Sequence, residues 1–271
     1  MAALVFVGVA VAGFSALPDV RGALRWPLLV LAAVVGVPVT LALNGIEYRL
    51  SGVMLGHAVP LWPAMRIAVL SSAANLLPVP GAVIVRTQAL RRLGSSLGRA
   101  TASALAIGGL WAGTTVALAG VARLAAGSAA AGGALLAAGV IGIGIGYALV
   151  RRLHGADGSA GLTATVVALE AVFVVVAALR LLWVIEGLGF DASLGQAVVL
   201  SLSGVVASVV AVFPGGLGIR EAVAGGLAPL IGLPASVALA AAAVDRLIGV
   251  LVLAPIAAGF AGASSHEETP A

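Results

Sequence analysis

Two short stretches of this chain decide its fold, and they share the same order of residues. The first, from Asn75 to Arg86, reads Asn-Leu-Leu-Pro-Val-Pro-Gly-Ala-Val-Ile-Val-Arg. The second, from Val212 to Glu221, reads Val-Phe-Pro-Gly-Gly-Leu-Gly-Ile-Arg-Glu. In both, a Pro-Gly pair follows an apolar run, and an arginine stands six residues after the proline. Each pair is expected to interrupt a helix, because proline removes a backbone donor and glycine permits a sharp reversal.

The composition around these stretches is that of an integral membrane protein. Of 271 residues, 62% are hydrophobic and only 9% are charged, whereas soluble domains carry roughly 25% charged residues. A helix that crosses a bilayer needs roughly 20 apolar residues. We therefore expect an all-α integral membrane protein with about six spanning helices, at residues 2–17, 28–46, 100–121, 131–150, 162–186 and 235–260.

The two other apolar stretches, at about 63–79 and 194–213, run into the Pro-Gly breaks. A broken helix at membrane depth is stable only inside protein or beside water. We expect two re-entrant hairpins, each entering and leaving the membrane on one side; two proline-kinked helices are the alternative. The halves at about 63–121 and 194–260 then form an inverted repeat. They belong to a single polytopic membrane domain, residues 1–262, with a disordered tail at 263–271.

The distribution of arginines favours this topology. With the N-terminus in the cytoplasm, seven arginines share the cytoplasmic side: Arg49, Arg66, Arg91, Arg92, Arg99, Arg151 and Arg152. The opposite side receives three from its loops: Arg21, Arg25 and Arg123. Such an excess is typical of cytoplasmic loops. We therefore expect a multi-pass protein with a cytoplasmic N-terminus.

The composition also excludes several classes of function. The absence of cysteine excludes disulfides, thiolate metal sites and cysteine catalysis. The three histidines show no metal-ligand spacing. A net charge of +4 without a basic tail does not indicate nucleic-acid binding. No cofactor and no metal is predicted, and no acid, base and nucleophile stand at a spacing that would indicate an enzyme.

The residues that follow the two breaks predict an anion site. A helix that begins there presents unpaired amides and the positive end of its dipole. Arg86 and Arg220 lie one or two turns further on, and amides together with a guanidinium suit a phosphate. The alternative is that both arginines pair with nearby acids and carbonyls and hold the hairpins closed. Glycines that allow a backbone to approach a ligand stand at both breaks: Gly81, Gly215, Gly216 and Gly218.

The remaining intramembrane polar residues have more than one interpretation. Glu221 is a candidate headgroup contact, but with Asp245 and Arg246 it can form a self-neutralising network around the preceding arginine, and we favour a structural role for the latter two. Glu170 lies inside a predicted span, where it either carries a coupling proton or pairs with an arginine. Asn75 is counted among the candidate contacts, although capping the freed backbone groups suits it better.

The same residues carry a resemblance to a known family. The segment from Pro214 to Ala222, with the alanine-rich helix that ends near Arg246, resembles the second half of the lysylphosphatidylglycerol synthase transmembrane (flippase) family. The stretch from Asn75 to Leu93 resembles its first-half motif, and the similarity covers about residues 28–260. One departure stands out: the family's first half usually carries acidic and basic residues after the hairpin, where this chain reads Ala106-Ile-Gly-Gly-Leu-Trp-Ala-Gly113.

The resemblance implies a stand-alone translocator of an anionic phospholipid or polyprenyl-linked lipid in the bacterial cytoplasmic membrane. Its headgroup would lie between the hairpins, in contact with Arg86, Arg220 and Glu221. The implied partners are membrane lipids, with an envelope-synthesis enzyme or a second copy of the chain as further partners. We expect no enzyme activity, because no aminoacyltransferase domain follows the last helix. A small-solute or ion secondary transporter, and a scaffold for a cell-envelope glycosyltransferase, are the alternative functions.

Overall fold

The computed structural model describes residues 24–75, 81–209 and 218–267, and every regular element in these ranges is helical. Five helical segments are long and apolar enough to cross a membrane, which confirms an all-α integral membrane protein. They are Trp26–Met54, Leu97–Ala125, Ala129–His154, Ser159–Gly187 and Ala235–Phe260. The sixth expected span, residues 2–17, lies outside the described residues.

The first of these segments is continuous but not uniform. It consists of α2 (Trp26–Leu31), a π-helical turn η1 (Ala32–Gly36) and α3 (Val37–Met54). A single π-turn inside a helix often marks a functional site, because it shifts the side chains that follow it. The segment also extends past the expected end at residue 46, so that Glu47 lies within the helix.

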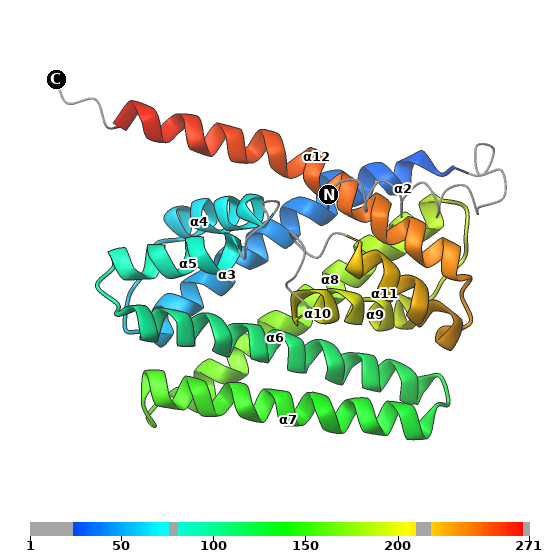
Figure 1. The fold of residues 1–271 in the computed structure, drawn as a ribbon, viewed down its shortest axis with the longest axis horizontal. Helices are drawn as coiled ribbons and strands as arrows, with labels where there is room; N and C mark the ends of the chain where they lie inside the picture. The colour runs from blue at the N-terminus through cyan, green and yellow to red at the C-terminus, as the bar shows by residue number, and fades with distance from the viewer. Residues whose placement is uncertain (1–23, 76–80, 210–217, 268–271) are drawn as a thin grey trace.

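Short helices flank both Pro-Gly breaks. On either side of residues 76–80 lie α4 (Leu61–Ala74) and α5 (Gly81–Arg92), which pack against each other (Figure 1). The 14 residues of α4 extend about 21 Å, which is less than the hydrocarbon core of roughly 30 Å. Around residues 210–217 the short helices are α9 (Leu194–Leu200), α10 (Leu202–Val209), α11 (Ile219–Leu227) and the 3-10 turn η3 (Ala228–Ile231).

The long helices frame these short ones. The helices α6 (Leu97–Ala125) and α7 (Ala129–His154) lie side by side along one edge of the molecule (Figure 1). Their approach requires glycine, since a Cβ on Gly113 would stand 2.7 Å from the backbone nitrogen of Ile143. On the other side of the bundle, α8 (Ser159–Gly187) and α12 (Ala235–Glu267) meet the short helices. A large buried apolar cluster holds α8, α9, α11 and α12 together, with Ile185 and Leu200 fully buried in it.

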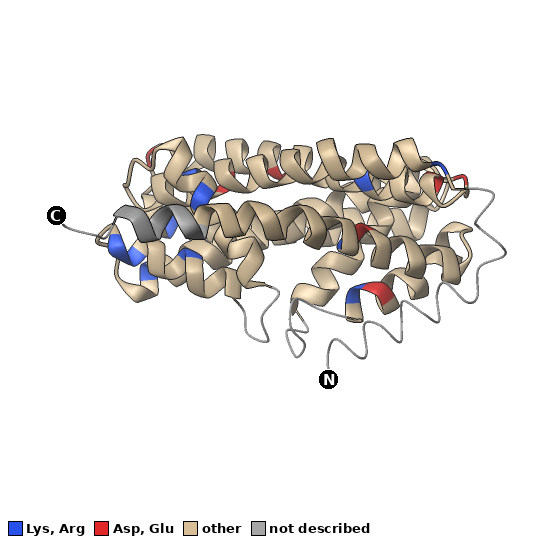
Figure 2. Cartoon of the chain, turned by 90° about the horizontal axis from the view of Figure 1, so that it is seen from above, with Lys and Arg blue, Asp and Glu red and all other residues tan. Residues whose placement is uncertain are grey.

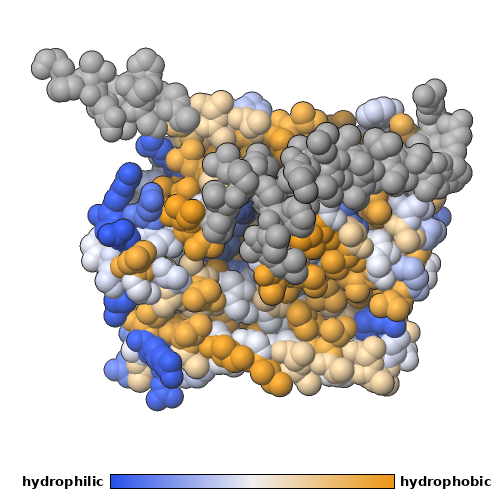
Figure 3. Space-filling model, viewed as in Figure 1, coloured by the Kyte–Doolittle hydropathy of each residue, from blue (hydrophilic) through white to orange (hydrophobic). Residues whose placement is uncertain are grey.

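Exposed charge gathers toward the two ends of the bundle with a largely apolar surface between them (Figure 3), and further charged residues lie inside the bundle (Figure 2). At one end Arg99 donates to the carbonyl of Leu153 at 3.0 Å, which ties the start of α6 to the end of α7. Arg49 donates to the carbonyl of Val59 at 3.0 Å in the same region. Arg123 lies at the opposite end of α6. The helix order thus places the arginines of the α3, α5 and α7 ends together, as the loop charges predict.

Candidate functional site

Arg86 forms the first polar centre inside the helical bundle. From α5 its guanidinium pairs with Glu47 of α3, donates from Nη2 to Asn44 Oδ1 at 3.3 Å, and donates from Nε to Ser71 Oγ at 3.4 Å. Arg86 therefore ties α5 to both α3 and α4. The structure pairs this arginine with an acid, which comes from a helix far away in the sequence.

The start of α5 explains two of the predicted residues. The side chain of Asn75 accepts a hydrogen bond from the backbone nitrogen of Ala82 at 2.9 Å, which is the capping contact expected of it. Gly81 is buried, and a Cβ there would overlap the carbonyl of Ala74. The lack of a side chain at Gly81 therefore allows α5 to approach α4.

The second polar centre is built around Asp245, which is 1% exposed. Arg180 of α8 donates to it twice, from Nε to Oδ1 at 2.6 Å and from Nη2 to Oδ2 at 2.9 Å. Arg220 of α11 donates from Nη2 to Oδ2 at 3.2 Å, and its Nε is buried without a hydrogen-bond partner among the described residues. Two guanidinium groups thus share one carboxylate, which leaves these three described residues with one positive charge in excess.

The π-helical turn makes room for Arg180. A Cβ on Gly36 would stand 2.7 Å from Cγ of Arg180, so the glycine lets the arginine pass across η1. The remaining nitrogen of this guanidinium, Nη1, donates to Thr40 Oγ1 at 3.3 Å. Thr40 in turn donates to the carbonyl of Gly36 at 2.7 Å. The local structure of one helix therefore orients a charged residue of another.

Glu221 caps the start of α11 and also accepts a hydrogen bond from Arg246 of α12. Its Oε2 accepts from the backbone nitrogen of Gly218 at 2.8 Å, and its Oε1 accepts from Arg246 Nη1 at 3.3 Å. Gly218 has a φ of +82°, a conformation that glycine adopts without strain. Glu221 itself is fully buried. The predicted network is thus real, but Arg180 adds to it a charge that the network does not neutralise.

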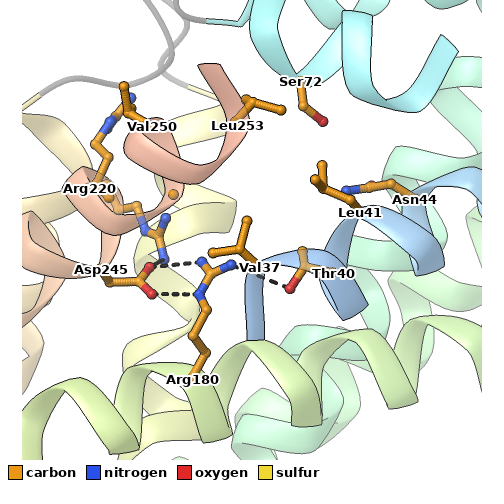
Figure 4. Close-up of a pocket in the computed structure, with 12 residues that line it drawn as sticks. Val37, Thr40, Leu41, Asn44, Ser72, Arg180, Arg220, Asp245, Val250 and Leu253 are labelled. Carbon is orange, nitrogen blue, oxygen red and sulfur yellow. Dashed lines mark hydrogen bonds and ion pairs between the residues drawn. The ribbon is translucent and has the colours of Figure 1, made fainter. Parts of the chain in front are cut away.

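The two centres border one cavity of about 270 Å³ (Figure 4). Arg180, Arg220 and Asp245 lie at one side of it, and Asn44 and Ser72 lie at the other. Asn44 also accepts from Arg86, so it joins the cavity to the first centre. The walls include apolar side chains of α3 and α12: Val37, Leu41, Val250 and Leu253. A ligand here meets cationic, hydrogen-bonding and apolar groups together.

Glu170 is a third buried polar group, separate from these pairs. It lies on α8 and is 1% exposed, and its Oε1 has no hydrogen-bond partner among the described residues. The ion pairs described above do not include it. Within the described part of the chain, Glu170 therefore forms no interhelical pair with an arginine.

The structure thus brings together Arg220, Glu221, Asp245 and Arg246, while Arg86 contacts the same cavity through Asn44. Gly215 and Gly216 lie outside the described residues. Sequence reasoning missed Arg180, Glu47, Thr40 and Asn44. For Arg180 and Glu47 the available signal was a charged residue within or beside an apolar helix, whereas Thr40 and Asn44 are uncharged and offered no such signal.

A family model described as the lysylphosphatidylglycerol synthase TM region matches residues 1–257. The chain belongs to this family. Membership in the lysylphosphatidylglycerol synthase TM family ties this membrane protein to lipid handling. Comparison with curated proteins and with solved structures gave no match.

Proposed function

We propose that this chain translocates an anionic phospholipid or a polyprenyl-linked lipid across the bacterial cytoplasmic membrane. The headgroup occupies the cavity between α3, α8, α11 and α12, and the acyl or prenyl chains stay in the bilayer. The observation that carries the proposal is the sharing of Asp245 by Arg180 and Arg220 at the edge of this cavity. It leaves a positive charge at membrane depth, where charge is costly without a partner.

A phosphate is the ligand that best suits these groups. Guanidinium groups bind phosphate oxygens through paired, charge-assisted hydrogen bonds. Arg220 has a buried Nε without a described partner, and its side chain is 28% exposed, so part of it stays available to a ligand. Asn44 and Ser72 offer further polar contacts across the cavity. The phosphate competes with Asp245 for the arginines, which keeps the site reversible.

The short helices supply the second part of the proposal. We take α4 with α5, and α10 with α11, as re-entrant hairpins of an inverted repeat within one membrane domain. Alternating access then consists of movement of one repeat against the other around the cavity. The arginine-rich end of the bundle faces the cytoplasm, as the positive-inside tendency favours. In this reading the protein is a transporter without catalytic activity.

Mass spectrometry of the lipids retained by purified protein tests the proposal. Wild type is compared with Arg86→Ala and Arg220→Ala, and with Arg92→Ala as a matched control on the exposed last turn of α5. We expect selective retention of one anionic lipid by wild type and by the control, and loss of it in the two other variants. Translocation of a fluorescent analogue in proteoliposomes should fall in parallel.

Other outcomes point to the alternative functions. Retention of bulk lipid in proportion to the membrane, unchanged by either substitution, contradicts the lipid proposal. A small solute or ion that then moves across protein-containing vesicles identifies a secondary transporter. A requirement for the chain that appears only when an envelope glycosyltransferase is present identifies a scaffold.

A further inference from the structure

A second cavity, of about 540 Å³, lies where α6, α9 and η3 meet. It shares no lining residue with the cavity that Arg220 and Asp245 border. Its polar lining residues are Arg123 of α6, Ser193 at the start of α9, and Gln196 of α9. Cavities of about 300–1,000 Å³ are typical of small-ligand sites. This one therefore has room for a headgroup of its own.

The length of α6 places this cavity near a membrane surface. Arg99 lies near the start of α6, at the arginine-rich end of the bundle, and Arg123 lies in its last turn. At 1.5 Å per residue, the two arginines are about 36 Å apart along the helix. This separation exceeds the hydrocarbon core of roughly 30 Å. Arg123 therefore reaches the level of the lipid phosphates on the surface opposite to the arginine-rich end.

The guanidinium of Arg123 has neutral partners. Its Nη1 donates to the carbonyl of Leu230 in η3 at 2.9 Å, and its Nη2 donates to Ser128 Oγ at 2.6 Å. The ion pairs of the described residues do not include Arg123. Among the described residues that line the cavity, none is acidic. The charge of Arg123 is therefore available to an anion, unlike that of the arginines paired inside the bundle.

Hydrogen-bond donors remain unused at this cavity. A guanidinium has five N–H donors, and the described hydrogen bonds of Arg123 use two of them. The hydroxyl of Ser193 accepts from the backbone nitrogen of Gln196 at 3.2 Å, and the described hydrogen bonds leave its own hydrogen unused. Guanidinium groups bind phosphate oxygens through short, charge-assisted hydrogen bonds. The cavity thus offers a cation and a hydroxyl donor to a phosphate.

The wall opposite to Arg123 is held in place by polar contacts. Gln196 accepts from the backbone nitrogen of Ser193 at 2.7 Å and donates from Nε2 to the carbonyl of Ile231 at 2.8 Å. Arg123 binds the carbonyl of Leu230, the preceding residue of η3. Both ends of the Gln196 side chain are therefore fixed, and η3 is tied to α6 as well as to α9. Such preorganisation lowers the cost of binding a ligand.

The elements around the cavity also suit acyl chains. Each of them exposes large apolar side chains: Val121 and Leu124 of α6, Leu194 of α9, and Leu230 of η3. Exposed apolar groups beside a cation favour a ligand that carries both an anion and apolar chains. A lipid has both, whereas a soluble phosphate ester has only the anion.

We propose that the cavity between α6, α9 and η3 is a second binding site for the phosphate of an anionic lipid headgroup. Arg123 is its anion-binding residue and Ser193 is a hydrogen-bond donor to the phosphate. The site is separate from the cavity of the proposed translocation and goes beyond that function. It would bind a lipid at the membrane surface opposite to the arginine-rich end, where the bound phosphate competes with the carbonyl of Leu230 for the guanidinium.

Labelling of a single cysteine measures occupancy of this site. Ala126 lines the cavity and is exposed, and the chain has no cysteine of its own. The reaction of Ala126→Cys with a water-soluble maleimide is followed in detergent with dihexanoyl phosphatidylglycerol. We expect this lipid to slow the reaction, and dihexanoylglycerol, which has the same chains without a phosphate, to leave the rate unchanged. Equal protection by both lipids overturns the inference.

Two arginine variants of the Ala126→Cys protein test the role of the guanidinium. In Arg123→Gln, loss of a charge-assisted hydrogen bond should raise the phosphatidylglycerol concentration for half-protection roughly tenfold. Arg152→Gln, at the exposed end of α7, is the matched control and should leave this concentration unchanged. Half-protection at the same concentration in Arg123→Gln and in its parent contradicts the proposed site.

Glycerol phosphate distinguishes a lipid from a soluble ligand. It carries the phosphate without acyl chains, so we expect it to protect Ala126→Cys only at much higher concentration than phosphatidylglycerol. Protection by both at the same concentration would identify a soluble phosphate ester as the ligand and reject the lipid assignment.

The Arg220→Ala variant separates this site from the proposed function. Because Ser193 is exposed and Arg123 is half-buried, lipid bound here exchanges with detergent during purification, and retained lipid reports the other cavity. Protection of Ala126→Cys should be unchanged in Arg220→Ala. Loss of protection in this variant shows that one site accounts for all binding and rejects the second site. Protection in a protein that retains no anionic lipid supports the second site and counts against the proposed function.

A measurement that keeps Arg123 covers the case in which Arg123→Gln fails to fold. Ala129 is exposed and follows Ser128, the partner of Arg123. A nitroxide on Ala129→Cys should broaden the phosphorus NMR signal of bound dihexanoyl phosphatidylglycerol. A signal that stays sharp at concentrations that protect Ala126→Cys overturns the inference.

Discussion

Arg180 and Asp245 are joined by two hydrogen bonds across α8 and α12, from Nε to Oδ1 at 2.6 Å and from Nη2 to Oδ2 at 2.9 Å. This parallel arrangement is the strongest geometry available to an arginine and a carboxylate. It fixes the relative position of two helices that also border the cavity. The pair is therefore both a structural connection and one side of the candidate site.

Removal of this arginine should destabilise the protein. In Arg180→Ala, Asp245 keeps only the bond from Arg220, so we expect a loss of roughly 1.5–3 kcal/mol in the free energy of unfolding. Unfolding in detergent, followed by circular dichroism, measures it. Arg152→Ala, at the exposed end of α7, is the control and should change stability by less than about 0.5 kcal/mol. Equal stability of the two variants would contradict the assigned role.

A methyl group on Gly36 should displace Arg180. The added Cβ of Gly36→Ala would stand 2.7 Å from Arg180 Cγ, and overpacking of this kind costs roughly 1–3 kcal/mol. Gly133→Ala in α7 is the matched control, because a Cβ there meets no atom within 4 Å. The free energy of unfolding of Gly133→Ala should rise by about 0.5–1 kcal/mol, because alanine has a higher helix propensity than glycine. Thermal unfolding of both distinguishes a specific contact from a general intolerance of alanine.

Lysine at position 86 should not restore the function of Arg86. The guanidinium uses three nitrogens on three partners, Glu47, Asn44 and Ser71, whereas an ammonium group is a compact point charge. In Arg86→Lys we expect roughly tenfold lower lipid translocation with the fold intact, since a lost charged hydrogen bond is worth about 1.5 kcal/mol or more. Arg91→Lys, exposed near the end of α5, should retain wild-type rates. Full activity of Arg86→Lys would show that charge alone is sufficient.

Cysteine labelling tests the re-entrant hairpins directly, because the chain contains no cysteine of its own. Positions before and after the first hairpin, Ala58→Cys and Leu93→Cys, should react with an impermeant maleimide from the same side. Ala126→Cys, between α6 and α7, should react from the opposite side. All three residues are exposed. Labelling of Ala58→Cys and Leu93→Cys from different sides would identify α4 and α5 as a kinked span.

The second hairpin allows the reciprocal experiment. Asp191→Cys and Ala235→Cys flank it and are exposed. In an inverted repeat both should react from the side that labels Ala126→Cys. Reaction of either one from the side of Leu93→Cys would contradict the inverted arrangement.

Much of the fold was predictable, because length and hydropathy specify a spanning helix. The helices expected at 100–121, 131–150 and 162–186 correspond to Leu97–Ala125, Ala129–His154 and Ser159–Gly187. Arg86 and Arg220 were also predictable as charged residues to examine, since each follows a Pro-Gly pair at the end of an apolar run. These signals are local, so a single sequence contains them.

The partners of these arginines were not predictable for a physical reason. Glu47 was missed because the expected span ended at residue 46, whereas α3 continues to Met54. Arg180 lies late in a predicted span, and nothing near it in the sequence indicates that its partner is Asp245. Which helix faces which is decided by packing, including the space that Gly36 leaves, and one sequence does not contain that information.

The sharing of Asp245 also has a consequence for how the protein is made. Arg180 precedes its carboxylate partner by 65 positions, so α8 reaches the membrane while the helix that carries Asp245 is still being synthesised. A charged side chain is costly in the bilayer until it is paired. Until α12 is inserted, the unpaired Arg180 is therefore favoured near the lipid surface or within the insertion machinery. Insertion of α12 then supplies its carboxylate partner. A chain that stops before α12 therefore lacks the carboxylate that accepts both hydrogen bonds from Arg180.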